Sequence, residues 1–193
     1  MINSLNTELK QAKRKSAKPM LWVSMISMTM MFAGLTSAYV VSRKRDDWVS
    51  FDLPDSFFIS TALIILSSIT FYWAKQSIKK ANQNKTTLFL IATFVLGSAF
   101  IFFQLQGFNQ LINSGLFFTG EQSTVKSSFI YGITGAHIIH IIAGLIVVGV
   151  VFFKNLRGKY TSTNYLGLEL GEIFWHFVDV LWIYLILFFY FIR

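Results

Sequence analysis

The run Glu172-Ile173-Phe174-Trp175-His176-Phe177-Val178-Asp179 sets three ionisable side chains inside the last apolar stretch of this chain. Glu169 lies about one turn earlier and extends the series. At 100° per residue, the four ionisable side chains fall within an arc of about 80° on one helix face. An ionisable group near the middle of a bilayer costs about 2.5–3.5 kcal/mol. We therefore expect this polar stripe to face protein, water or a lipid head group.

The composition is that of an integral membrane protein. Of the 193 residues, 54% are hydrophobic and 13% are charged, whereas about a quarter are charged in soluble domains. A spanning helix needs about 20 apolar residues, and the stretches of that kind are residues 19–41, 56–74, 86–106, 128–153 and 167–192. The sequence predicts an all-α integral membrane protein, a bundle of five transmembrane helices that forms one domain over residues 19–193. A basic cytoplasmic tail over residues 1–18 precedes it, either as a weak amphipathic helix or as a disordered segment.

The distribution of positive charge predicts the orientation in the membrane. With the N-terminus inside, the inner segments carry twelve Lys and Arg residues: Lys10, Lys13, Arg14, Lys15, Lys18, Lys75, Lys79, Lys80, Lys85, Lys154, Arg157 and Lys159. The outer segments carry five, namely Arg43, Lys44, Arg45, Lys126 and Arg193. An excess of positive charge marks the cytoplasmic side, so we expect the N-terminus in the cytoplasm and the C-terminus outside. Topology thus accounts for the net charge of +8, and nucleic acid is not an expected partner.

Small residues inside two spans predict close helix packing. Gly34 and Ala38 lie four residues apart in the first span, and Gly132 and Ala136 do so in the fourth. Small residues at this spacing let helix backbones approach closely in lipid. The hydroxyl side chains of span 56–74 are expected to bond the carbonyls of the preceding turn.

The ionisable side chains inside the spans are His137, His140, Glu169, Glu172, His176 and Asp179, and they admit three kinds of role. A di-iron site requires four carboxylates with Glu-x-x-His on two helices, which the spacing does not match, whereas His140 and His176 could hold a haem between two helices. Glu, His and Asp residues could also form a proton-transport path, although no repeat is visible. In the third role these groups bond one another or carbonyls across helices, at about 0.6 kcal/mol per bond. Lys154, at the predicted inner end of the fourth span, could hold a lipid phosphate.

Four segments in order resemble the haem-copper oxidase subunit III family. They are Trp175-His176-Phe177-Val178-Asp179-Val180-Leu181-Trp182, Gly135-Ala136-His137-Ile138-Ile139-His140-Ile141-Ile142-Ala143-Gly144, Phe32-Ala33-Gly34-Leu35 with Ala38-Tyr39, and Ser67-Ser68-Ile69-Thr70. The resemblance covers about residues 19–193. It is closest to the short bacterial type with five helices.

The resemblance implies a subunit without a catalytic centre, in a complex of the bacterial plasma membrane that reduces oxygen and pumps protons. It implies that this chain binds no haem or copper, which lie in partner subunits, and that it packs on the catalytic subunit I beside subunit II. It further implies that the chain stabilises subunit I, supports proton uptake and holds phospholipid. A respiratory supercomplex is a further partner that it allows. By position, His137, His140, Glu169, His176 and Asp179 become structural or lipid-cleft polar groups, and Lys154 faces a lipid phosphate.

The chain departs from the family pattern at three positions. Met28 and Gly107 stand where many members carry an acid. Glu172 stands where a small residue is common, and we expect it to pair locally with His176.

Overall fold

Residues 2–45, 48–120 and 123–192 are described by a computed structural model of the protein, with the backbone alone described at residues 2–11, 13 and 14. Among the charges that predict the orientation, Arg193 and the side chains of Lys10, Lys13 and Arg14 lie outside this description.

The described residues form five long helices, as the sequence predicts. They are α1 (Ile2–Ser42), α2 (Asp55–Lys79), α3 (Gln83–Asn113), α4 (Val125–Leu156) and α5 (Leu166–Phe191). Each contains a segment that is long and apolar enough to cross a membrane. The prediction of an all-α bundle with five spans is therefore confirmed.

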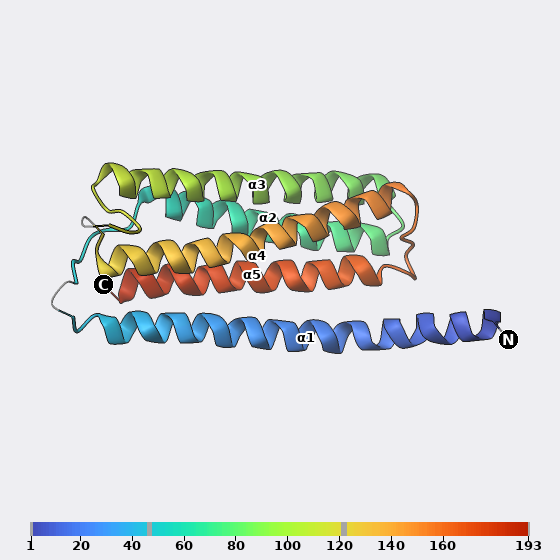
Figure 1. The fold of residues 1–193 in the computed structure, drawn as a ribbon. Helices are drawn as coiled ribbons and strands as arrows, with labels where there is room; N and C mark the ends of the chain where they lie inside the picture. The colour runs from blue at the N-terminus through green and yellow to red at the C-terminus, as the bar shows by residue number, and fades with distance from the viewer. Residues whose placement is uncertain (1, 46–47, 121–122, 193) are drawn as a thin grey trace.

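Of the helices, α1 and α3 extend furthest beyond their predicted spans. The α1 helix begins at Ile2 and continues through Pro19, so the segment expected as a separate tail is helical and joined to the span. Figure 1 shows this N-terminal part of α1 reaching beyond the other four helices. The α3 helix continues past Gln106 to Asn113, because Leu111 is buried in the core and extends the apolar face by a further turn.

The helix ends follow from local backbone chemistry. The side chain of Asn82 accepts the Lys85 N–H at the start of α3, and Thr124 forms a capping box with Ser127 at the start of α4. Such caps satisfy N–H groups that have no partner within the helix. At the opposite ends, Gly115 and Gly158 adopt positive φ after α3 and α4, a conformation that glycine reaches without strain.

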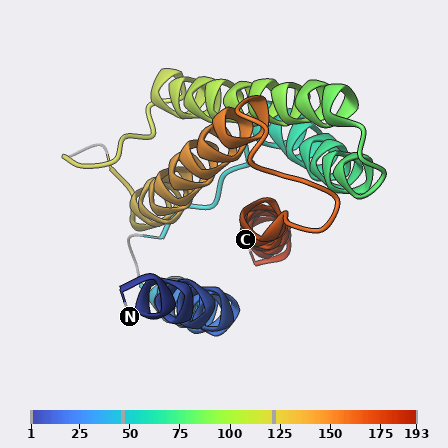
Figure 2. The same ribbon diagram turned by 90° about the vertical axis from the view of Figure 1, so that its right-hand side faces the viewer.

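Four of the helices form a closed ring, and α1 lies against its side. The contacting pairs are α2–α3, α3–α4, α4–α5 and α5–α2, while α1 contacts α4 and α5. Figure 2 shows α1 and α5 nearly end-on, with α5 between α1 and the α2–α3 pair. The polar stripe therefore lies on a helix that contacts three others, α1, α2 and α4.

Two glycines on neighbouring helices lie close against Trp175, which is fully buried. A Cβ atom on Gly97 would lie 2.6 Å from Trp175 Cη2, and one on Gly144 would lie 3.0 Å from Trp175 Cε3. These two glycines, on α3 and α4, leave the room that the indole ring fills. By contrast, a Cβ atom on Gly34 or Gly132 would meet no atom within 4 Å.

The small-residue pairs were expected to allow close helix packing. Inside the described chain they do not make such contacts. Gly34, Ala38 and Gly132 are exposed, and Ala136 alone of the four is packed against the core. The spacing predicts close packing but does not identify which helix the face meets. Packing of Gly34 and Ala38 on a helix of another chain remains a prediction.

Candidate functional site

The α2–α5 seam, defined as the contact surface between these two helices, is joined by hydrogen bonds from two tryptophans. Trp175 Nε1–H donates to Ser67 Oγ at 2.9 Å, and Trp182 Nε1–H donates to Thr61 Oγ1 at 2.9 Å. The tryptophans are seven residues apart, which puts them on the same face of α5. Each buried indole N–H thus has an acceptor on α2.

The polar stripe of α5 meets a second set of side chains on α2 and forms a connected polar chain. Lys75 Nζ pairs with Glu172 Oε2, and Glu172 Oε1 lies 3.8 Å from His176 Nε2. His176 Nδ1 lies 2.8 Å from Ser68 Oγ, and the Ser68 hydroxyl also bonds Asp179 Oδ2. We call these five residues the α2–α5 polar chain.

The members of this polar chain differ in burial. The Glu172 side chain is 4% exposed and the Lys75 side chain 21%, while Asp179 is 2% exposed. A groove of about 360 Å³ runs along the outside of the seam, and it is lined by Ile65, Ser68, Ile69, Tyr72, His176, Asp179, Val180 and Ile183. Isoleucine and valine side chains thus form much of the wall of this groove beside the polar groups.

Glu169, the first member of the stripe, lies apart from the polar chain and joins α5 to α1. Its Oε1 atom lies 2.8 Å from Lys18 Nζ. Two further contacts tie the same helices: Thr36 Oγ1 lies 3.1 Å from the Tyr184 hydroxyl, and the Tyr39 hydroxyl donates to the Ile192 carbonyl. The stripe therefore serves two seams rather than one.

The two histidines of α4 have different surroundings. His137 is fully buried, stacks on Trp182 at a ring-centroid distance of 5.2 Å and contacts Phe32 and Phe100 edge-on. Neither of its ring nitrogens has a hydrogen-bond partner, so it packs as an aromatic ring. His140 Nδ1–H donates to the Ala136 carbonyl at 2.7 Å, within its own helix.

These positions do not favour the haem alternative. His140 contacts Phe32 of α1, whereas His176 bonds Ser68 of α2, so the two side chains have different neighbours. Among the described residues, no group of three or more His, Asp or Glu side chains is placed to hold a metal ion.

The sequence identified the ionisable side chains of α5 and missed their partners on α2. The hydroxyls of Thr61 and Ser67 do bond carbonyls of the preceding turn, as predicted. They also accept hydrogen bonds from the tryptophans of α5. Ser68 likewise bonds His176 and Asp179 of that helix. The signal available in the sequence was weak: Ser68 and Lys75 lie seven residues apart and therefore on one face of α2.

The structure explains one of the missing family acids. A Cβ atom on Gly107 would overlap the Phe57 ring, lying 2.6 Å from its Cδ1 atom. Because Phe57 is fully buried, no acidic side chain fits at this position. Met28 is half-buried and packs against the apolar core, where the thioether side chain replaces the acid of other family members.

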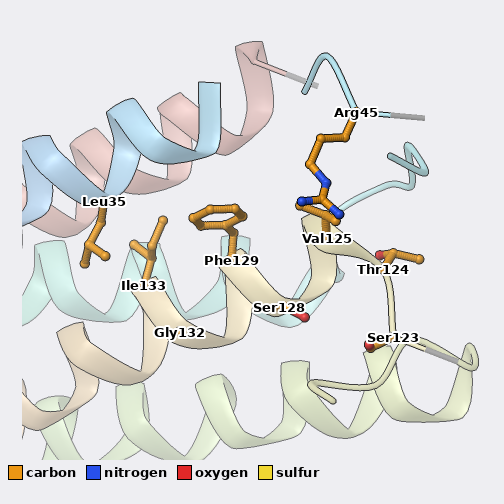
Figure 3. A pocket seen from close by; sticks show the side chains of 9 residues that line it. All are labelled: Leu35, Arg45, Ser123, Thr124, Val125, Ser128, Phe129, Gly132 and Ile133. Atoms are coloured by element: carbon orange, nitrogen blue, oxygen red, sulfur yellow. The ribbon is translucent and has the colours of Figure 1, made fainter. Parts of the chain in front are cut away.

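A further groove of about 350 Å³ lies between the C-terminal end of α1 and the start of α4 (Figure 3). Leu35, Phe129 and Ile133 form its apolar part, and Arg45 lies over its mouth. None of the predicted polar site residues line it. Lys154 is exposed at the far end of α4.

The comparisons with known proteins confirm the resemblance. The family model for cytochrome c oxidase subunit III matches residues 49–193. The chain is 34% identical over 142 residues to the probable cytochrome c oxidase subunit 3 of Rickettsia felis, covering 72% of this chain and 48% of that protein. It is 30% identical over 170 residues to the cytochrome c oxidase subunit 3 of Thermostichus vulcanus, covering 86% and 82%.

The chain spans about half the length of the Rickettsia relative and most of the Thermostichus relative. Together with the five apolar helices, these bacterial relatives support the prediction of a multi-pass protein of the plasma membrane. The match over three quarters of the residues shows that the chain belongs to the cytochrome c oxidase subunit III family.

Proposed function

We propose that this chain is the non-catalytic subunit III of a bacterial respiratory haem-copper oxidase. The family match carries this proposal. The subunit packs on the catalytic subunit I beside subunit II, which hold the haems and copper, and it stabilises subunit I and supports proton uptake. The geometry agrees with a chain that has no redox centre of its own, because the ionisable stripe of α5 bonds Lys18, Lys75 and Ser68 of its own chain.

The same proposal gives the predicted polar residues internal roles. The ionisable stripe of α5 fixes this helix against α1 and α2 through Glu169, Glu172, His176 and Asp179. His137 fills the core between Phe32, Phe100 and Trp182. Hydrogen bonds between membrane helices are modest individually, at about 0.6 kcal/mol on average. Together these bonds set the register of α5, in which Glu172 and Asp179 are buried.

The subunit also holds phospholipid, with Lys154 as the phosphate contact. Lys154 is exposed in the last turn of α4. It directly follows Phe152 and Phe153, which line an apolar groove of about 190 Å³ between α3 and α4. An ammonium group beside an apolar groove suits an anionic head group and its acyl chain.

Purification of the tagged chain from membranes tests the oxidase assignment. We expect it to co-purify with a haem-containing partner, and to be colourless once separated from that partner in stronger detergent. A haem band at one equivalent per separated chain that is lost in His176→Ala, and kept in the control His137→Ala, would instead establish the alternative of a free-standing b-type haem protein.

A further inference from the structure

The carboxyl group of Asp179 lies midway along α5 and has a single hydrogen-bond partner, the Ser68 hydroxyl. Its Oδ1 atom is buried and has no hydrogen-bond partner. Among the described residues, no Lys, Arg or His nitrogen lies within ion-pair distance of it. Asp179 is 2% exposed, and the wall of the groove beside it is formed largely by Ile65, Ile69, Val180 and Ile183, so neither a counter-charge nor bulk water compensates a negative charge here.

Glu172, two turns away on the same helix, has the opposite surroundings. Its two carboxylate oxygens face Lys75 Nζ and His176 Nε2. A buried carboxylate with an ammonium partner is compensated, whereas a buried carboxylate with one hydroxyl partner is not, because its desolvation exceeds what a single hydrogen bond returns. In a membrane this difference is larger, because no water can reach the group.

We propose that Asp179 is protonated in the folded protein and that Ser68 and His176 share its proton, so that the α2–α5 seam contains a proton-storage site. The proposal rests on the contacts within this chain and does not depend on assembly with an oxidase.

A protonated Asp179 fixes the donor and the acceptor of each contact from Asp179 to Glu172. Its Oδ2–H donates to Ser68 Oγ, and the Ser68 O–H donates to His176 Nδ1 at 2.8 Å. A neutral imidazole that accepts at Nδ1 carries its hydrogen on Nε2, and this N–H faces Glu172 Oε1 at 3.8 Å. Glu172 Oε2 accepts from Lys75 Nζ. If Asp179 were ionised, Ser68 would donate to it and accept from His176 Nδ1–H. The Nε2 lone pair of a neutral His176 would then face the Glu172 carboxylate.

The stored proton can move along this chain without a change of net charge. The proton of Asp179 Oδ2 passes to Ser68 Oγ while the hydroxyl proton of Ser68 passes to His176 Nδ1. The products are an Asp179 carboxylate and a His176 imidazolium, and the imidazolium lies beside Glu172. The other titratable groups that face the three residues come from the same two helices: Tyr72 and Lys75 on α2 and Glu172 on α5.

Infrared spectroscopy of the full chain in lipid vesicles at neutral pH tests the protonation directly. A protonated carboxylic acid has a carbonyl stretch that is separate from carboxylate and amide bands and that shifts in D₂O. We expect this band in the wild type and in the matched control Glu172→Gln, and its loss in Asp179→Asn. A wild type without the band, or a band that survives in Asp179→Asn, overturns the proposal.

Thermal unfolding in detergent gives an independent result. Asp179→Asn replaces a neutral acid by a neutral amide and should leave the midpoint unchanged, whereas Glu172→Gln leaves Lys75 without its counter-charge and should lower it. An equal loss in the two variants would mean that Asp179 is charged. In the infrared experiment, Ser68→Ala should keep the band but slow its exchange for deuterium, and unchanged exchange contradicts the role of Ser68.

Discussion

Trp175 is the residue around which three helices of the ring close. Its indole N–H bonds Ser67 of α2, and its ring lies against the Cα positions of Gly97 on α3 and Gly144 on α4. A fully buried tryptophan has no space to move away from an added atom. Packing at this point therefore depends on the absence of side chains at two glycines.

A pair of glycine substitutions measures this dependence. Gly97→Ala should lower the free energy of unfolding by about 1–3 kcal/mol, because its Cβ would lie 2.6 Å from Trp175 and 2.9 Å from Leu145. Gly34→Ala is the matched control on an open face and should leave stability unchanged or slightly raised, since alanine favours helix. Denaturant unfolding in detergent, followed by tryptophan fluorescence, gives both values. Equal losses in the two variants would contradict the packing described.

At this scale the sequence predicted the stripe but not its partners. The arc of Glu169, Glu172, His176 and Asp179 follows from helix geometry alone. Ser68 and Lys75 are ordinary residues for the middle and the end of a membrane helix, and only the approach of α2 to α5 makes them partners of the stripe. For the same reason, spacing singled out Gly34 and missed Gly97.

Among the elements, α1 is held least firmly. Within the described chain it contacts only α4 and α5, through Phe32, Tyr39, Thr36 and the exposed Lys18–Glu169 pair. Exposed ion pairs contribute about 0–1 kcal/mol, so the apolar contacts of Phe32 with the α4 histidines carry more of the attachment.

Two substitutions separate these contributions to α1 docking. Phe32→Ala removes a fully buried ring and should cost about 3 kcal/mol or more, while Glu169→Gln should cost about 1 kcal/mol or less. The free energy of unfolding in detergent and the rate of proteolysis in the connection 43–54 report the two effects. A larger loss from Glu169→Gln would show that the ion pair, rather than the ring, holds α1.

Hydropathy gave the elements themselves, because a run of about 20 apolar residues in a membrane chain has few alternatives to a helix. It did not give their ends. The α3 helix continues through Asn109 and Gln110, which are polar and exposed, because Leu111 is buried on the other face. Composition averages over both faces and cannot separate such a turn from a loop.

At the scale of the whole molecule, positive charge is unequal between the two ends of the bundle. The loop between α4 and α5 carries Arg157 and Lys159, and Lys75, Lys79 and Lys80 lie at the same end, where α2 turns into α3. We infer that this end is cytoplasmic, with the connections 43–54 and 114–124 outside.

Because the chain has no cysteine, single introduced cysteines can test this orientation without background. Ser50 and Ser162 are exposed and lie in connections at opposite ends of the bundle. A membrane-impermeant thiol reagent should label Ser50→Cys in intact cells, and should label Ser162→Cys only after the membrane is opened. Labelling of both in detergent is the control for accessibility. The reverse pattern would place the N-terminus outside, and Lys154 would then face the outer leaflet rather than the anionic lipids of the inner one.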